Sequence, residues 1–112
     1  MARGGDVDVT IEPLSEGGTV VRVEGELDMA TSPDFEKALE SADARSRIVV
    51  DLSGCTFIDS SAVRVLIAAT RATETADGKI SLVANDPGIL RVLEIAAVDT
   101  MLPVHPSLES AL

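Results

Sequence analysis

The stretch "RIVVDLSGCTFIDSSAVRVLIAA" (residues 47–69) holds the pattern that decides the fold. Residues 47–52 form a continuous apolar run with β-branched side chains, which predicts a central strand covered on both faces. A short polar loop is expected after Leu52. Apolar side chains then recur from about residue 60 to 76 at helical spacing, which predicts a long, well-buried helix directly after the strand.

Two alternating segments precede the central strand. Residues 6–14 and 19–27 both alternate apolar and polar side chains, which is typical of half-buried strands. The glycine-rich stretch between them predicts a turn, and hence an antiparallel hairpin. A short amphipathic helix is expected next, with Thr31 or Ser32 as its N-cap and Pro33 at its first position.

The second half of the chain repeats the strand–helix order. Residues 80–85 are apolar and predict another strand, and the Asp-Pro pair after them predicts the start of a third helix. Residues 101–106 are expected to hold a short strand at the sheet edge, because Pro103 is poorly tolerated at a sheet centre. The final residues are expected to add a last helical turn.

These elements predict one α/β domain over residues 1–112, in the order β-β-α-β-α-β-α-β. Strand–helix–strand repetition implies right-handed parallel crossovers. The opening hairpin then makes the central sheet mixed, with about four to five strands and helices packed against it. Residues 1–5 are expected to be disordered.

Composition excludes several kinds of function. The formal net charge of -10 disfavours binding to nucleic acid or to an anionic membrane surface, and suits a basic protein partner. No apolar run approaches the roughly 18–20 residues of a membrane span. The chain begins without an apolar signal segment and has one cysteine, Cys55, so the expected compartment is the cytoplasm.

The string Asp59-Ser60-Ser61 at the start of the long helix is the main candidate for chemistry. One interpretation is helix capping by the side-chain oxygens. Another is a modified serine, because the free N–H groups and dipole of a helix start tolerate a phosphate. A nucleophilic serine would need a base, and His105 is the single histidine; with no G-x-S-x-G elbow present, a hydrolase is set aside.

A metal site is not expected, since one cysteine and one histidine offer no pair of ligands at helical spacing. No glycine-rich phosphate loop is present, so no cofactor is expected. Cys55 lies beside the candidate serine and is interpreted as a small loop residue, with redox sensitivity as the alternative. The string "GELDMATSP" (25–33) predicts a turn into a capped helix, and Asp28 and Asp59 are expected to be neighbours on one surface.

Together these strings resemble the STAS family, and specifically bacterial anti-sigma factor antagonists. "GELD" (25–28) matches a family loop after the second strand. "DLS" through "FIDSSA" (51–62) matches the family pattern before the second helix, with Ala62 where glycine is usual. "ISLVANDPGILRVLEIAAVD" (80–99) is similar to the last strand and helix of the family, with Ala97 at a usual glycine.

The resemblance implies a protein switched by phosphorylation that has no enzymatic activity of its own. Ser60 would be the acceptor, with Ser61 as second choice, and the partner would be an anti-sigma factor that is an ATP-dependent serine kinase. The unphosphorylated form would bind that kinase and release the sigma factor; phosphorylation would end binding, and a serine phosphatase would reset it. Other partner contacts would come from Asp28, Asp59, Ser61, Ala62 and Arg64.

The free protein is then expected to be a monomer. The alternative is a STAS domain of another class, a scaffold or ligand-sensing module of a larger complex without a phosphorylated serine.

Overall fold

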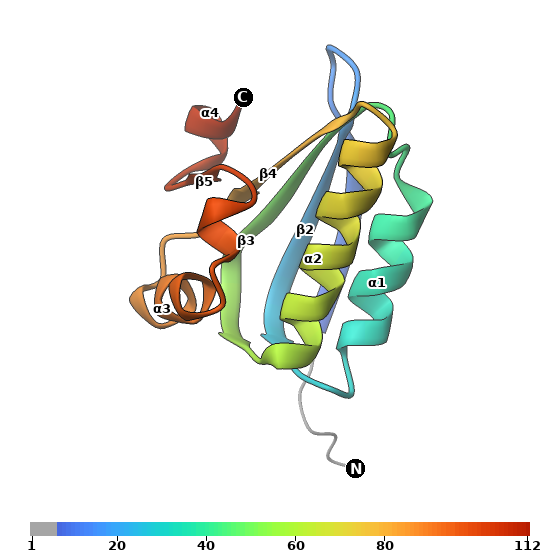
Figure 1. Cartoon of the computed structure of the whole chain (residues 1–112). Helices are drawn as coiled ribbons and strands as arrows, with labels where there is room; N and C mark the ends of the chain where they lie inside the picture. Colours follow the sequence, from blue (N-terminus) through green and yellow to red (C-terminus); the bar gives the residue numbers. More distant parts are fainter. Residues whose placement is uncertain (1–6) are drawn as a thin grey trace.

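The computed structural model describes residues 7–112, so the expected disorder of residues 1–5 lies outside the described residues. The elements follow in the order β1 (Val7–Pro13), β2 (Thr19–Leu27), α1 (Ser32–Ser41), β3 (Arg47–Ile58), α2 (Ser60–Thr75), β4 (Lys79–Val83), α3 (Pro87–Ile95), the 3-10 helix η1 (Val98–Thr100), β5 (Val104–His105) and α4 (Leu108–Ala111). Figure 1 shows them along the chain. The predicted order of strands and helices is confirmed.

A single five-stranded sheet organises the molecule, in the order β1-β2-β3-β4-β5. β1 and β2 pair antiparallel as a hairpin, and β2, β3, β4 and β5 pair in parallel. The mixed sheet expected from the sequence is therefore correct. None of the helices within residues 7–112 has the length and apolar character that crossing a membrane requires.

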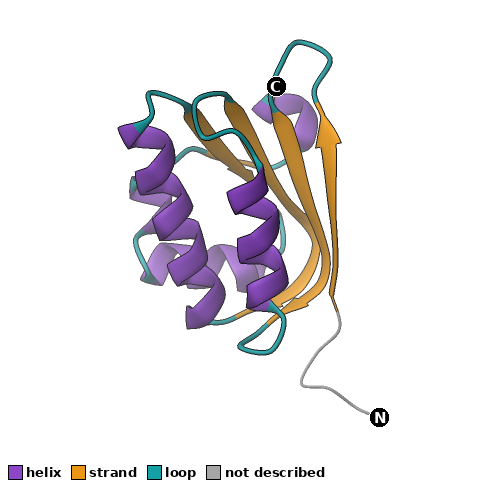
Figure 2. Ribbon diagram, turned by 90° about the vertical axis from the view of Figure 1, so that its right-hand side faces the viewer, coloured by secondary structure: helices purple, strands orange, loops and turns teal. Residues whose placement is uncertain are grey.

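The main core lies between the sheet and the helices. α1 and α2 run side by side over one face of the sheet (Figure 2). Alternate strand residues such as Val21 and Val50 point into this core, where Phe35 of α1 and Leu66 of α2 are fully buried. A small second cluster on the opposite face joins Val20, Val49 and Val83 to Ala111 of α4.

β3 is longer than the sequence pattern predicted. The loop expected after Leu52 is wrong, because β3 continues beside β2 as far as Ile58. Two register shifts each insert one extra residue into β3, opposite Arg22/Glu24 and Gly25/Glu26. The buried positions Leu52, Cys55 and Ile58 are consequently three residues apart instead of two. The second half of β3 therefore lacks the alternation of apolar and polar residues that predicts a strand.

The turn after α2 places an aspartate, and not the neighbouring glycine, in the left-handed conformation. Asp77 takes the left-handed conformation, with φ of 61°, and Gly78 does not. Gly78 is required for another reason: a Cβ there would lie 1.9 Å from the carbonyl oxygen of Ala44. The glycine thus permits close approach between the α2–β4 turn and the loop before β3.

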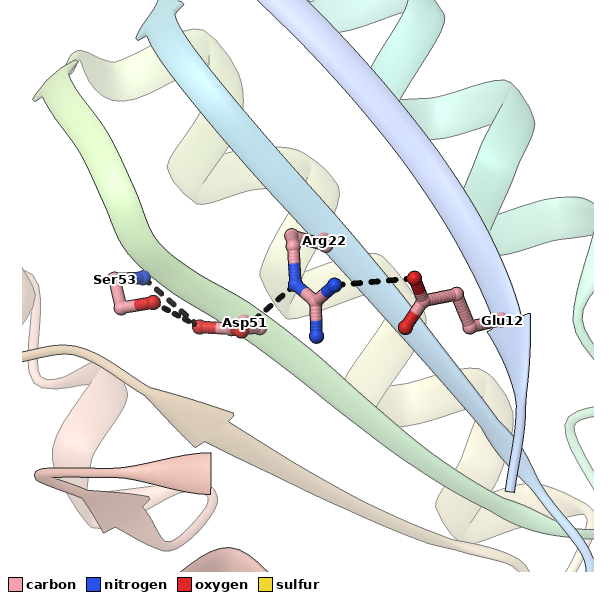
Figure 3. Close-up of polar contacts among 4 residues, drawn as sticks. All are labelled: Glu12, Arg22, Asp51 and Ser53. Atoms are coloured by element: carbon pink, nitrogen blue, oxygen red, sulfur yellow. Dashed lines mark hydrogen bonds and ion pairs between the residues drawn. The ribbon is translucent and has the colours of Figure 1, made fainter. Parts of the chain in front are cut away.

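A charged network ties the first three strands together on the face away from α1 and α2 (Figure 3). Arg22 on β2 donates from Nε to Asp51 at 3.2 Å and from Nη1 to Glu12 at 3.1 Å. Ser53 donates from its backbone N–H and its hydroxyl to the other oxygen of Asp51, at 3.0 and 2.7 Å. Asp51 is a buried charge, at 4% exposure, and it is fully partnered.

Burial raises the pKa of Asp51, but the hydrogen bonds from Ser53 and Arg22 outweigh it and hold the pKa below its usual range. The stabilisation from this carboxylate is therefore present above the unfolded-state pKa of about 3.9 and is lost as the pH falls through the lower folded-state value.

Asp51→Asn is expected to lower the free energy of unfolding at pH 7 by about 1–3 kcal/mol, because it weakens charge-assisted hydrogen bonds at a buried position. The difference from wild type should shrink as the pH falls below about 4. Urea unfolding at neutral and acid pH measures both values. Asp8→Asn, at an exposed position of β1, is the control. A difference that stays constant with pH would contradict the assigned role of the Asp51 charge.

Candidate functional site

The candidate site begins where β3 passes into α2. Asp59 is the N-cap of α2, with extended backbone, and its Oδ1 accepts a hydrogen bond from the backbone N–H of Ser61 at 2.9 Å. The same oxygen accepts a short hydrogen bond from the Ser61 hydroxyl. The capping interpretation of this string is therefore correct for Asp59.

The two serines after the cap differ in environment. Ser61 is half-buried, and its hydroxyl lies 3.1 Å from the Ser32 hydroxyl of α1 in addition to bonding Asp59. Ser60 is exposed, and its hydroxyl has no hydrogen-bond partner among residues 7–112. Ser60 thus offers the accessible hydroxyl of the pair.

The loop between β2 and α1 is shaped by Asp28. Its Oδ1 accepts hydrogen bonds from the backbone N–H groups of Ala30 at 2.9 Å and Thr31 at 3.0 Å. The Thr31 hydroxyl accepts from the N–H of Asp28 and donates to the Glu26 carbonyl, at 2.9 and 2.7 Å. Thr31 occupies the N-cap position of α1, but its side chain makes no cap hydrogen bond, since it holds this turn instead.

β2 and β3 bring the two loops together. Leu27 and Ile58 are paired at the ends of these parallel strands, and the N–H of Asp59 donates to the carbonyl of Leu27 at 3.1 Å. The Ser32–Ser61 contact joins the first turns of α1 and α2. The expected proximity of the loops carrying Asp28 and Asp59 is therefore what the structure shows.

Two large exposed apolar side chains, one in the β2–α1 loop and one near the end of β3, were not predicted from the sequence. Met29, in the Asp28 turn, is 78% exposed, and Phe57, near the end of β3, is 46% exposed. The second register shift sets Phe57 opposite Glu26. No pattern in the sequence predicts that shift, so the exposure of Phe57 could not be predicted either. Only the exposure of Met29 could have been predicted from the sequence, because Met29 directly follows Asp28 in an expected turn.

The two remaining predicted contact residues, Ala62 and Arg64, differ in their exposure to solvent. Ala62 is fully buried in the core, so its methyl group packs inside and not on the surface. Arg64 is exposed one turn beyond Ser60 on α2. A position four residues after Ser60 shares its side of the helix.

The structure separates the histidine from the serines. His105 lies on β5, which pairs with β4 at Val83, and Val83 is level with Asp51 of β3. Asp51 pairs with Arg22 of β2 and Ile58 pairs with Leu27, so from Asp51 to its end β3 spans five residues of its partner strand, which is roughly 17 Å at 3.3 Å per residue. Figure 1 shows β5 remote from the start of α2. The arrangement gives no support to a Ser-His pair.

Cys55 is a buried strand residue and not a loop residue as predicted. Burial raises the pKa of its thiol, which hydrogen-bonds the Phe57 carbonyl at 3.2 Å. A thiol in this state is a poor nucleophile. Among residues 7–112, no group of three or more Cys, His, Asp or Glu side chains is arranged to hold a metal ion.

Comparison with known proteins gives one consistent family. The RsfA anti-sigma-F factor antagonist of Mycobacterium tuberculosis is 29% identical over 101 residues, which cover 87% of this chain and 79% of that protein. The crystal structure of an anti-sigma factor antagonist from Mycobacterium paratuberculosis superposes with a TM-score of 0.83 at 29% identity, over 95% of this chain and 91% of the other.

More distant structures share the fold. SpoIIAA in its unphosphorylated form has a TM-score of 0.72 at 20% identity, over 93% of this chain and 92% of the other. The phosphorylated form of SpoIIAA from Bacillus has a TM-score of 0.71 at the same identity, over 93% and 96%. A family model described as Mlab, STAS domain, matches residues 12–103. Because that match spans most of the sheet and the loop–helix junction at Ser60, the chain belongs to the STAS domain family.

Proposed function

We propose that this chain is an anti-sigma factor antagonist switched by phosphorylation of Ser60. In its unphosphorylated form it binds an anti-sigma factor that is a serine kinase, and the sigma factor is released. Phosphorylation of Ser60 by that kinase ends binding, and a serine phosphatase restores it. Similarity to proteins named anti-sigma factor antagonists supports this function.

The observation that carries the choice of acceptor is the contrast between the two serines. A kinase needs an accessible hydroxyl, and Ser60 is exposed without a side-chain partner in the described chain. Phosphorylating Ser61 would require breaking its hydrogen bonds to Asp59 and Ser32. The proposed acceptor is therefore Ser60.

A phosphate on Ser60 would act mainly through its charge. It adds about -1.5 to -2 charges at neutral pH. The adjacent Asp59 carboxylate already caps the first turn of α2, so a second anion gains little from that helix end and repels the first. In a docked interface the phosphate must lose water beside this carboxylate, and a loss of about 3 kcal/mol would weaken binding more than a hundredfold.

The proposed contact surface surrounds Ser60. Met29 and Phe57 supply exposed apolar side chains of the kind that anchor interfaces, and Asp59 and Arg64 supply charge beside them. Asp28 contributes by shaping the loop that presents Met29, because its Oδ1 already accepts hydrogen bonds within the turn.

Incubation with ATP and a cognate anti-sigma kinase is expected to add one phosphate to the wild-type chain and to Ser61→Ala, and none to Ser60→Ala. Intact mass followed by peptide mapping measures this. Phosphate on Ser61, or on both serines, would contradict the assignment. No phosphate from any candidate kinase of the same genome would favour a scaffold or ligand-sensing STAS module instead.

Ser60→Asp is expected to weaken binding to the anti-sigma factor by at least about tenfold, because it places a second carboxylate beside Asp59. Ser60→Ala should bind within about threefold of wild type, since it removes only a surface hydroxyl. Isothermal titration calorimetry compares the three proteins, and circular dichroism checks that each is folded. Equal weakening by both substitutions would indicate that the hydroxyl itself, and not charge, controls binding.

A further inference from the structure

Arg64 is an exposed cation one helical turn beyond Ser60. Its guanidinium forms no ion pair with another residue of the described range 7–112. The side chains three and four residues away from Arg64 along α2 are those of Ser60, Ser61, Ile67 and Ala68. These are the positions that share its side of the helix, and none of them is an acid. The helix therefore supplies Arg64 with no anion while Ser60 is unmodified.

The geometry of α2 directs Arg64 toward Ser60. The two residues lie four apart, on the same side of the helix and about 6 Å apart along its axis. Helical Cα–Cβ bonds tilt toward the N-terminus, so a long side chain covers the turn before its own Cα. The turn before Arg64 begins at Ser60, whose hydroxyl is accessible. A phosphate on that hydroxyl would lie within reach of the guanidinium, which can donate two parallel hydrogen bonds to phosphate oxygens.

Other charged side chains do not replace Arg64 in this role. The charged side chains at the carboxyl ends of β2, β3 and β4 are all acids, which repel a phosphate: Glu26, Asp28, Asp59 and Asp86. Lys37 of α1 lines a hollow beside β1, on the side of α1 away from α2. Arg91 of α3 lines a hollow beside Val104 of β5. Arg64 is therefore the cation that the fold places beside Ser60.

We propose that a phosphate on Ser60 binds the guanidinium of Arg64 and so removes this cation from the contact surface around Ser60, an inference that rests on the proposed function. In the phosphorylation step the Oγ–P bond forms as the bond from the phosphoryl group to ADP breaks, and the hydroxyl loses its proton. Before this step Arg64 is available to the anti-sigma factor, and afterwards it is paired within its own chain. Phosphorylation then changes the surface twice, by adding negative charge and by removing a positive one.

Attachment to Ser60 gives the phosphate an advantage over an anion of the partner. An exposed ion pair between residues four apart on a helix is weak on its own. The short covalent link, however, keeps the phosphate near the guanidinium at an effective concentration in the millimolar range. The planar guanidinium also matches phosphate oxygens in geometry. An acidic side chain of the anti-sigma factor would therefore have to displace the phosphate to reach Arg64.

Phosphoserine placed at position 60 during synthesis of the full chain tests the pairing without any kinase. A cation close to the phosphate favours its dianion and lowers its second pKa. Arg64→Gln is therefore expected to raise that pKa by about 0.3 pH units, measured by phosphorus NMR at about 0.1 M salt. Arg64→Lys keeps the charge and should stay within about 0.1 of wild type.

Arg71→Gln is the matched control for this titration. Arg71 is exposed on the same side of α2, but it lies about 16 Å from Ser60 along the helix, beyond the screening distance of about 10 Å at this salt concentration. Its substitution should change the pKa of the phosphate by less than about 0.1 pH units. Equal pKa values in wild type and Arg64→Gln, or equal changes from Arg64→Gln and Arg71→Gln, would overturn the proposal.

Binding of the same proteins to the cognate anti-sigma factor tests whether Arg64 is removed from the contact surface. The measured quantity is the factor by which the phosphate raises the dissociation constant. Arg64→Gln should weaken binding of the unphosphorylated chain at least about threefold and reduce that factor by a similar amount, whereas Arg71→Gln should change both by less than about twofold. A factor that is the same in wild type and Arg64→Gln would overturn the proposal. A phosphate that leaves binding of the wild-type chain unchanged would instead overturn the switching function, and the pKa comparison would still decide whether Arg64 pairs with the phosphate.

Discussion

The backbone hydrogen bond from the N–H of Asp59 to the carbonyl of Leu27 marks the constraint on which the site depends. It forms because β2 and β3 are parallel and end together, at Leu27 and Ile58. Each strand is followed by a loop and a helix that turn back over the same face of the sheet. The Asp28 turn and the Asp59 cap are adjacent for that reason, although they are far apart in sequence.

The polar side chains at this junction have different roles: most hold the local structure by hydrogen bonds, and Ser60 does not. Oδ1 of Asp28 accepts hydrogen bonds within the β2–α1 turn, and Oδ1 of Asp59 accepts those of the α2 cap. Ser61 links this cap to α1 through its contact with Ser32. Ser60 is left accessible on a junction whose internal hydrogen bonds are already complete. Under the proposed function, a charge added at Ser60 would change what the surface binds without breaking these hydrogen bonds. The solved structures of SpoIIAA in its unphosphorylated and its phosphorylated form both share the fold of this chain.

The sequence predicted those elements whose side-chain period is regular. β1, β2 and the first half of β3 follow alternation or a continuous apolar run, and the structure contains them. The second half of β3 was missed because two bulges separate Leu52, Cys55 and Ile58 by three residues each. The exposure of Phe57 follows from the same shifts, so it was equally hidden. The pair Asp59-Ser60 was readable, because an acid before a helical run is a local capping signal, whereas the Ser32–Ser61 contact depends on tertiary structure.

The most direct test of a charge switch on an unchanged fold is amide NMR of the chain before and after stoichiometric phosphorylation of Ser60. We predict shift changes confined to residues 26–32 and 57–64, with the signals of β4, β5 and α3 unmoved. Such a result would mean that the phosphate alters the surface and leaves the sheet and helices in place. Changes spread through β4 and α3, or loss of the Asp59–Leu27 hydrogen bond by amide exchange, would contradict the account and indicate a conformational switch.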